Sequence, residues 1–144
     1  MTKKYVYSLD DRSIQEKGGS KARNLRFLLR HRYLVPAGWV ISWEALEDYQ
    51  KEGESILQLL RNELAGRILP ERLYAVRSSA SVEDDVQYSY AGVFRSYLHV
   101  QGIESILEHI QAVWQSLESK EFITYRENNH NDEAPVRMAV LVQA

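Results

Sequence analysis

Hydrophobic residues along the chain form two kinds of pattern, short runs and longer stretches with helical spacing. The short runs are rich in aromatic and β-branched residues, as strands are. They span residues 5–9, 39–41, 73–76, 93–100 and 136–142. In the fourth run, Phe94, Leu98 and Val100 should point to the same side of a sheet because strand side chains alternate. Since these runs alternate with stretches of helical spacing, we expect an α+β or α/β fold.

In the longer stretches an apolar residue recurs every three or four positions, which predicts helices with one buried face. These stretches lie at residues 20–29, 56–64 and 103–117, and we expect two further helices at 42–51 and 120–127. Ser20 and Ser42 are good N-cap residues and should begin the first two helices. Residues 78–91 and 128–132 are polar and have no period, so we expect them to be loops.

Composition narrows the class of protein. The 144 residues are 44% hydrophobic and 26% charged, which is typical of one soluble globular domain. A formal net charge of -2 gives no reason to expect nucleic acid as a partner. The absence of cysteine excludes disulfides and Cys-based zinc sites. We see no signal peptide and no segment that could cross a bilayer, so we expect a cytoplasmic protein without a membrane partner.

Two basic residues stand where a protein can hold phosphate. Lys21 follows Gly18-Gly19-Ser20 at a predicted helix start, where backbone amides and the helix dipole favour anions. The alternative is a solvated lysine after a turn. Arg77 ends an apolar strand, and its planar guanidinium can bind two phosphate oxygens. The alternative is a salt bridge to Glu83 or Asp84.

Other polar groups give weaker indications. Gly92 could let backbone amides approach an anion, or it could serve as a plain turn glycine. The acidic run at residues 83–85 could bind magnesium, but oxygen ligands usually come from several segments, which favours a solvated loop. Arginines on the first long helix could follow a nucleic-acid backbone, although such a polar helix face is ordinary. The four histidines lie far apart and have no metal-ligand spacing.

Taken in order, these segments resemble the ATP-grasp domain of the pyruvate phosphate dikinase and phosphoenolpyruvate synthase family. Residues 18–25, Gly-Gly-Ser-Lys-Ala-Arg-Asn-Leu, are similar to the family's Gly-Gly-Lys-x-x-x-Leu, with Ser20 in addition. Residues 35–42 resemble Val-Pro-x-Gly-Phe-x-Ile-Thr. Residues 75–92 resemble Ala-Val-Arg-Ser-Ser-Ala-Thr-x-Glu-Asp followed by Ser-Phe-Ala-Gly. Shorter similarities occur at residues 96–98, 112–117, 125–126 and 138–143.

The resemblance assigns roles to individual residues. It implies that Lys21 and Arg77 bind the triphosphate of ATP and act in catalysis. The segment from Ser89 to Ser96 would cover the phosphates, with Gly92 at its turn. Gln143 would lie near the adenine.

The resemblance also implies a fold and a reaction. Residues 1–144 would form a single domain, the N-terminal lobe of an ATP-grasp domain, with a mixed sheet and flanking helices. In the family, ATP phosphorylates a histidine on a separate swivelling domain, which carries the phosphoryl group to pyruvate or a similar acceptor. The partners would be ATP, Mg²⁺ with its ligands outside this chain, the missing C-terminal ATP-grasp lobe and the phospho-histidine domain. The chain alone would be inactive. The alternative is a non-catalytic, stand-alone nucleotide-binding or regulatory module of the same fold.

Overall fold

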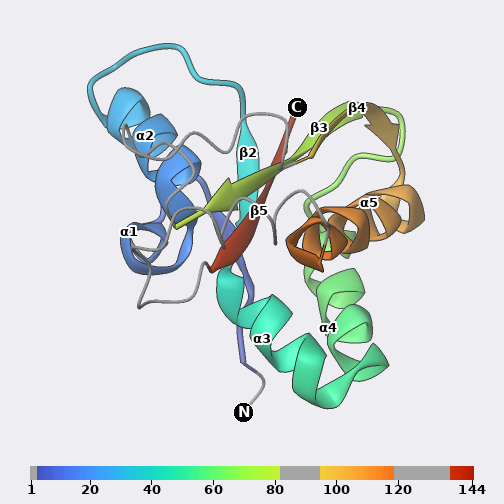
Figure 1. Ribbon diagram of the computed structural model, residues 1–144. Helices are drawn as coiled ribbons and strands as arrows, with labels where there is room; N and C mark the ends of the chain where they lie inside the picture. The colour runs from blue at the N-terminus through green and yellow to red at the C-terminus, as the bar shows by residue number, and fades with distance from the viewer. Residues whose placement is uncertain (1–2, 82–94, 119–136) are drawn as a thin grey trace.

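The computed structural model of the chain describes residues 3–81, 95–118 and 137–144, and Figure 1 shows their arrangement. The strands are β1 (Val6–Ser8), β2 (Gly38–Ile41), β3 (Leu73–Ala80), β4 (Ser96–Gln101) and β5 (Met138–Gln143). The helices are α1 (Ile14–Lys17), α2 (Gly19–Arg30), α3 (Trp43–Glu52), α4 (Glu54–Ala65) and α5 (Ile103–Gln115), which a 3₁₀ turn, Ser116–Glu118, follows. The predicted α+β class is confirmed.

The strands form one sheet in the order β1-β2-β5-β3-β4. Every pairing between described strands is antiparallel, so the sheet is antiparallel where the family resemblance implied a mixed one. The last strand, β5, lies between β2 and β3 and is buried at all of its residues. A strand that is buried on both faces reads as a continuous apolar run, which is how residues 138–142 appear in the sequence.

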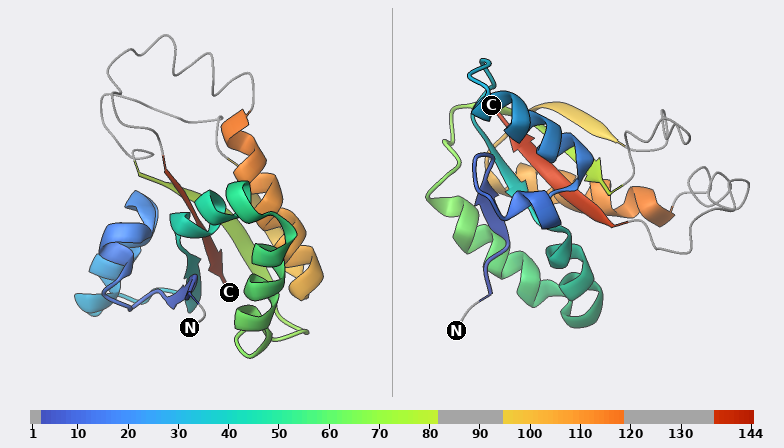
Figure 2. Two further views of the ribbon diagram at one scale, coloured as in Figure 1. Left: turned by 90° about the horizontal axis from the view of Figure 1, so that it is seen from below. Right: turned by 90° about the vertical axis from the view of Figure 1, so that its left-hand side faces the viewer.

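Helices cover both faces of the sheet, giving three layers (Figure 2). Helices α3, α4 and α5 pack on one face over Met138, Val140 and Val142. Helices α1 and α2 pack on the other face over a smaller cluster that includes Ala139 and Leu141. The side chains of β5 therefore alternate between two separate cores. None of the described helices is long and apolar enough to span a membrane.

Two sequence predictions about element boundaries were wrong. Helix α2 begins at Gly19, with Gly18 at the N-cap position, so Ser20 lies inside the helix. Its hydroxyl donates to the carbonyl of Ala80 at 3.1 Å instead of capping the helix. Residues 78–80, predicted as loop, belong to β3 because β5 pairs with them through to Met138. Polar residues can continue a strand wherever a neighbouring strand satisfies their backbone groups.

Two further predictions concern α3 and β4. Ser42 does stand at the N-cap position of α3, but its side chain makes no cap hydrogen bond. Leu98 and Val100 do not share an environment, since Leu98 is 65% exposed and Val100 only 3%. The pairing of β3 with β4 is irregular between Tyr74 and Val76, which breaks the alternation that the sequence suggested. The helix predicted at 120–127 and the loop at 128–132 lie outside the described residues.

Charged side chains tie the N-terminal strand to α3. Glu44 lies 2.9 Å from the amine of Lys17 and 3.3 Å from that of Lys3. Asp48 accepts hydrogen bonds from Lys3 at 3.0 Å and from the Tyr5 hydroxyl at 2.7 Å. The Lys17 hydrogen bond lowers the pKa of Glu44, and the Tyr5 hydrogen bond lowers that of Asp48. Both carboxylates therefore stabilise the fold in their charged form.

We expect Glu44→Gln to make the protein less sensitive to acid. A carboxyl group whose pKa is lower in the folded state stabilises fully above its unfolded pKa, and this contribution disappears as pH falls through the folded pKa. Wild type should lose that contribution between about pH 5 and pH 3, while Glu44→Gln lacks it throughout, a difference of roughly 0.2–1 kcal/mol at pH 7. Urea denaturation at about pH 7 and about pH 3 measures the difference in unfolding free energy between wild type and Glu44→Gln. Glu16→Gln, at an exposed glutamate with no ion pair within the described residues, is the control, and equal pH dependence of all three proteins would contradict the expectation.

Candidate functional site

Four of the six predicted site residues, Lys21, Arg77, Ser96 and Gln143, lie within the described part of the chain, while Ser89 and Gly92 lie outside it. Arg77 pairs with Leu141 of β5 on one side and with Ser96 of β4 on the other. Paired residues of antiparallel strands point to the same face. Leu141 packs in the cluster beneath α2, so Arg77 and Ser96 lie on the α2 face of the sheet.

Lys21 is anchored to β3 from the first turn of α2. Its amine donates to the backbone carbonyl of Ser78 at 3.0 Å, and the side chain is half-buried. Lys21 is therefore not simply a solvated lysine after a turn. Because Ser78 follows Arg77 directly, this contact brings a lysine ammonium to the strand residue next to the arginine.

The start of α2 lies directly against β3, and this close approach explains the paired glycines. Gly19 has a φ of +82°, and a Cβ there would overlap the backbone carbonyl of Ser79. Only glycine takes such a conformation readily and leaves the space empty. Gly18 is also crowded, since a Cβ would lie 2.9 Å from that of Ile14. The two glycines therefore let helix and strand meet backbone to backbone.

Ser79 joins the two segments, a role that the sequence analysis missed. Its hydroxyl donates to the Gly18 carbonyl at 2.7 Å and accepts from the Ala22 amide at 3.1 Å. Ser79 is fully buried, so this hydroxyl is satisfied entirely by α2. The only local signal was the polar Ser78-Ser79 pair after an apolar run, which is equally typical of a turn.

Arg77 lies on the face of the sheet against which α2 packs. The residue is half-buried, and within residues 3–81, 95–118 and 137–144 its side chain makes no hydrogen bond or ion pair. The alternative partners Glu83 and Asp84 lie outside those residues. A half-buried guanidinium can bind the oxygens of a phosphate in a bidentate manner.

Gln143 lies on the same face, further along β5. It is two residues beyond Leu141, roughly 7 Å along the strand from the position opposite Arg77. The side chain is largely buried, and its amide donates to the Pro36 carbonyl at 3.1 Å. Gly38 opposite leaves room for it, since a Cβ there would lie 3.0 Å from the Gln143 Cγ. Gln143 therefore holds the segment before β2 against the end of β5.

The described residues contain no group of three or more side chains that could hold a metal ion. The acidic run at 83–85 lies outside them. The site residues that the structure brings together are thus cationic and hydroxyl-bearing, which suits an anion.

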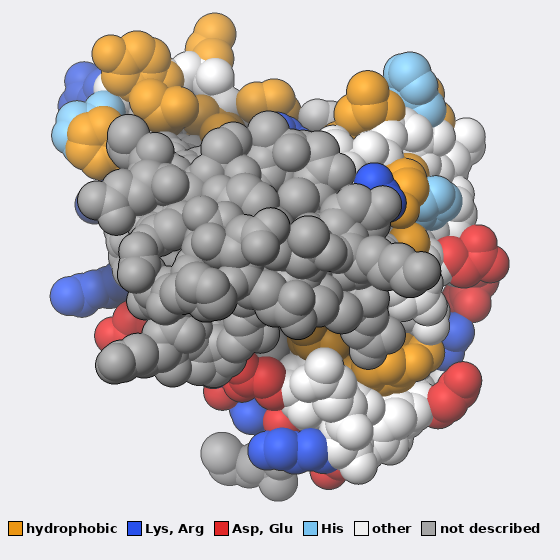
Figure 3. All heavy atoms as spheres, in the orientation of Figure 1, with side chains coloured by type: hydrophobic (Ala, Val, Ile, Leu, Met, Phe, Trp, Pro, Cys, Tyr) orange, Lys and Arg blue, Asp and Glu red, His pale blue; other side chains and the backbone are white. Residues whose placement is uncertain are grey.

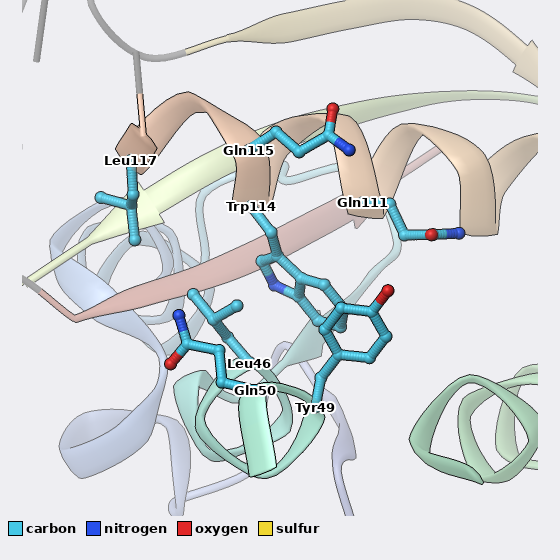
Figure 4. Close-up of a pocket in the computed structure, with 7 residues that line it drawn as sticks. All are labelled: Leu46, Tyr49, Gln50, Gln111, Trp114, Gln115 and Leu117. Atoms are coloured by element: carbon cyan, nitrogen blue, oxygen red, sulfur yellow. The ribbon is translucent and has the colours of Figure 1, made fainter. Parts of the chain in front are cut away.

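A pocket of about 80 Å³ lies on the opposite face, between α3 and α5 (Figure 4). Tyr49 and Trp114 stack beside each other there, with ring centroids 5.1 Å apart. Its lining residues are Leu46, Tyr49, Gln50, Gln111, Trp114, Gln115 and Leu117. None of these is charged or was predicted as a site residue, so this pocket does not suit a triphosphate.

Hydrophobic side chains are exposed along the upper edge of the molecule in Figure 3, which is the side where the chain leaves β5 in Figure 1. Phe27, Tyr33 and Leu34 lie at and after the end of α2 and are 57%, 63% and 102% exposed. Leu98 on β4 is 65% exposed. Exposed apolar groups of this size often mark contact surfaces.

The chain matches one family model and several known proteins. The model of the pyruvate phosphate dikinase AMP/ATP-binding domain matches residues 54–144, which include Arg77 and Gln143. The chain is 30% identical over 160 residues to an uncharacterized phosphotransferase of Bacillus subtilis, covering 96% of the chain, Lys21 included, and 19% of that relative.

Two further relatives have named activities. The chain is 36% identical over 105 residues to a probable phosphoenolpyruvate synthase of Methanothermobacter thermautotrophicus, covering 72% of the chain and 15% of the relative. It is 50% identical over 70 residues to a rifampicin phosphotransferase of Streptomyces sviceus, covering 49% of the chain and 8% of the relative. The chain thus spans less than a fifth of the length of each of these proteins.

Proposed function

Because the chain belongs to the family of the pyruvate phosphate dikinase AMP/ATP-binding domain, we propose that it binds the triphosphate of ATP through Lys21 and Arg77. The observation that carries this proposal is the contact between the Lys21 amine and the Ser78 carbonyl, next to Arg77. Two segments that both resemble phosphate-binding motifs meet at this contact. Lysine offers a compact point charge and arginine a planar fork, and triphosphate sites use both.

The other predicted residues complete the proposed site. Ser96 pairs with Arg77. We propose that the segment from Ser89 to Ser96, with Gly92 at its turn, covers the bound phosphates. Gln143 lies on the same face further from Lys21, which suits a place nearer the adenine. Catalysis would rest on positioning and charge neutralisation by Lys21, Arg77 and Mg²⁺. We place the magnesium ligands outside this chain.

The wider reaction follows from the relatives. We propose that residues 1–144 are the N-terminal lobe of an ATP-grasp domain in a longer, cytoplasmic phosphotransferase. That protein would transfer a phosphoryl group from ATP to a histidine on a swivelling domain, and then to pyruvate or a similar acceptor. The relatives, which are phosphotransferases several times longer than the chain, support this proposal. The lobe alone would hold about half of the nucleotide site and would not turn over.

The exposed apolar side chains support a partner lobe at the end of β5. Phe27, Tyr33 and Leu34 lie at and after the end of α2, and Leu98 lies on β4. A second ATP-grasp lobe that packs there would bury them and would close the nucleotide between the two lobes. Burial of apolar surface would then hold the lobes together.

Titration with Mg-ATP tests the proposed site. A ligand at about one hundred times its dissociation constant stabilises the folded state by about 2.7 kcal/mol, which a thermal melt detects. Lys21→Ala and Arg77→Ala each remove a charge-assisted contact worth about 1.5–3 kcal/mol, so each should weaken binding roughly ten- to one-hundredfold. Lys51→Ala, on α3 at the opposite face of the sheet, and Arg72→Ala, at an exposed arginine just before β3 begins, are matched controls.

A longer version of the protein that continues past residue 144 should be titrated in parallel. If the lobe requires its partner, only the longer protein will be stabilised, and the two variants should reduce that stabilisation. The proposal fails if Mg-ATP stabilises neither protein. It also fails if the control variants weaken binding as much as Lys21→Ala and Arg77→Ala do.

A further inference from the structure

Ser79 occupies an unusual place in the first turn of α2. In an undisturbed helix the amide of Ala22 would donate to the carbonyl of Gly18, four residues earlier. In this protein the Ser79 hydroxyl accepts from the Ala22 amide at 3.1 Å and donates to the Gly18 carbonyl at 2.7 Å. A side chain from β3 thus bridges the two groups of a helical hydrogen bond, which is one way that helices are bent or held open.

Neighbouring residues of α2 contact the same short piece of β3. The Ser20 hydroxyl donates to the Ala80 carbonyl at 3.1 Å, and the Lys21 amine donates to the Ser78 carbonyl at 3.0 Å. Gly19 lies against the backbone of Ser79 itself. Among these contacts, Ser79 alone uses its side chain to hold the backbone of the helix on both sides of Lys21.

We propose that Ser79 is a positioning residue that sets the distance between Lys21 and Arg77. This inference rests on the proposed ATP site, because it concerns how two of its residues are held. Arg77 is held in place because it belongs to β3. Lys21 belongs to α2, and without β3 the first turn of this helix could form its direct hydrogen bond from the Ala22 amide to the Gly18 carbonyl. The Ser79 hydroxyl prevents that hydrogen bond and keeps the first turn against β3.

Removing the hydroxyl should shift Lys21 without unfolding the protein. In Ser79→Ala the Ala22 amide and the Gly18 carbonyl lose the hydroxyl that they share. Because glycine can move from its φ of +82° to a helical value, Gly19 allows the two groups to pair directly as in an ordinary helix. Few buried groups would then remain unsatisfied, so the fold should persist. The first turn would draw away from β3, and the contact between the Lys21 amine and the Ser78 carbonyl would weaken.

The first test does not involve nucleotide. The rate at which a small amine-reactive ester modifies Lys21, read by mass spectrometry and normalised to exposed Lys51, reports how firmly the Lys21 amine is held. We expect Ser79→Ala to raise this rate about three- to tenfold, because the hydrogen bond of the Lys21 amine would be weakened but not lost. Ser42→Ala is the matched control, because Ser42 is equally buried and its hydroxyl has no partner within the described residues.

A double-mutant cycle then separates positioning from general support of the fold. Ser79→Ala should weaken Mg-ATP binding about three- to tenfold in the wild-type background and leave it unchanged in Lys21→Ala, because its effect passes through Lys21. If Ser79→Ala does not fold, Ser79→Cys replaces it, since a thiol donates and accepts only weakly and should raise Lys21 modification to an intermediate rate.

The positioning role of Ser79 and the proposed ATP site can be disproved independently of each other. An unchanged rate of Lys21 modification in the folded Ser79 variant overturns the positioning role, whatever the nucleotide does. An equal loss of Mg-ATP affinity in both backgrounds also overturns it, because a structural role does not require Lys21. If Lys21 modification rises as expected but wild type binds no Mg-ATP, the positioning role stands and the proposed function fails.

Discussion

Gly19→Ala should cost the protein roughly 2–5 kcal/mol of unfolding free energy, through two separate effects. The φ of +82° at Gly19 is unfavourable for any residue with a Cβ, by about 1–2 kcal/mol. The added methyl group would also overlap the Ser79 carbonyl and lie 2.6 Å from the Ser79 hydroxyl oxygen. Both groups belong to Ser79 of β3, which lies between β5 and β4 in the sheet. The helix must therefore move instead of the strand, and α2 should detach from β3.

Two other glycines separate these effects. Gly53 also has a positive φ, +70°, but a Cβ there would meet nothing within 4 Å, so Gly53→Ala should show the conformational cost alone. Gly66 has an ordinary φ and open space, and Gly66→Ala should be neutral or stabilising by up to about 1 kcal/mol. Urea denaturation of the three variants measures the difference. If Gly19→Ala loses no more stability than Gly53→Ala, the close packing of α2 on β3 is contradicted.

Local sequence pattern predicted most of the elements because their periodicity is strong. In α5, apolar residues recur with helical spacing from Ile106 to Trp114, and all of the repeated positions are buried. The sequence placed β5 at 136–142, close to its observed bounds of Met138–Gln143. Boundaries were less certain where a polar residue can belong to either state. Ser78 to Ala80 continue β3 only because β5, some sixty residues later, pairs with them.

The arrangement of strands was beyond the reach of local pattern. Alternation shows that a segment is a strand but not which strand lies beside it or in which direction. The insertion of β5 between β2 and β3 depends on contacts between segments far apart in the chain. The direction of the strands could not be read from local pattern either. The family resemblance implied a mixed sheet, whereas the described pairings are all antiparallel.

Local pattern could propose the charged residues of the candidate site but not how they are held. Lys21 and Arg77 were proposed because each stands in a pattern typical of phosphate-binding residues, and their binding of phosphate stays a prediction. The structure places the Lys21 amine at the carbonyl of Ser78, the residue after Arg77. Ser79 was missed because its role exists only when Gly18 and Ala22 are brought to it from 57 and more residues away. A buried serine after an apolar strand has no local signature that separates such a bridge from a turn.

If Lys21 and Arg77 bind the triphosphate, the amine of Lys21 lies beside the phosphates of bound ATP. An ATP analogue that carries an acyl group on its terminal phosphate tests this directly, because a lysine amine close to that phosphate takes the acyl group and ATP is released. Mass spectrometry then identifies the modified lysine. Using both this chain and a version that continues past residue 144 covers a site that needs its second lobe.

We expect Lys21 to be the principal modified lysine within residues 1–144. Excess Mg-ATP should suppress this modification, and Arg77→Ala should weaken it, because the phosphates would then be held less firmly. Lys3 and Lys51 lie elsewhere on the molecule, and the amine of Lys17 pairs with Glu44 at 2.9 Å. All three should react no faster than with an acyl phosphate that lacks the nucleotide. Modification spread evenly over these lysines, or modification of Lys21 that excess Mg-ATP does not reduce, would contradict the account.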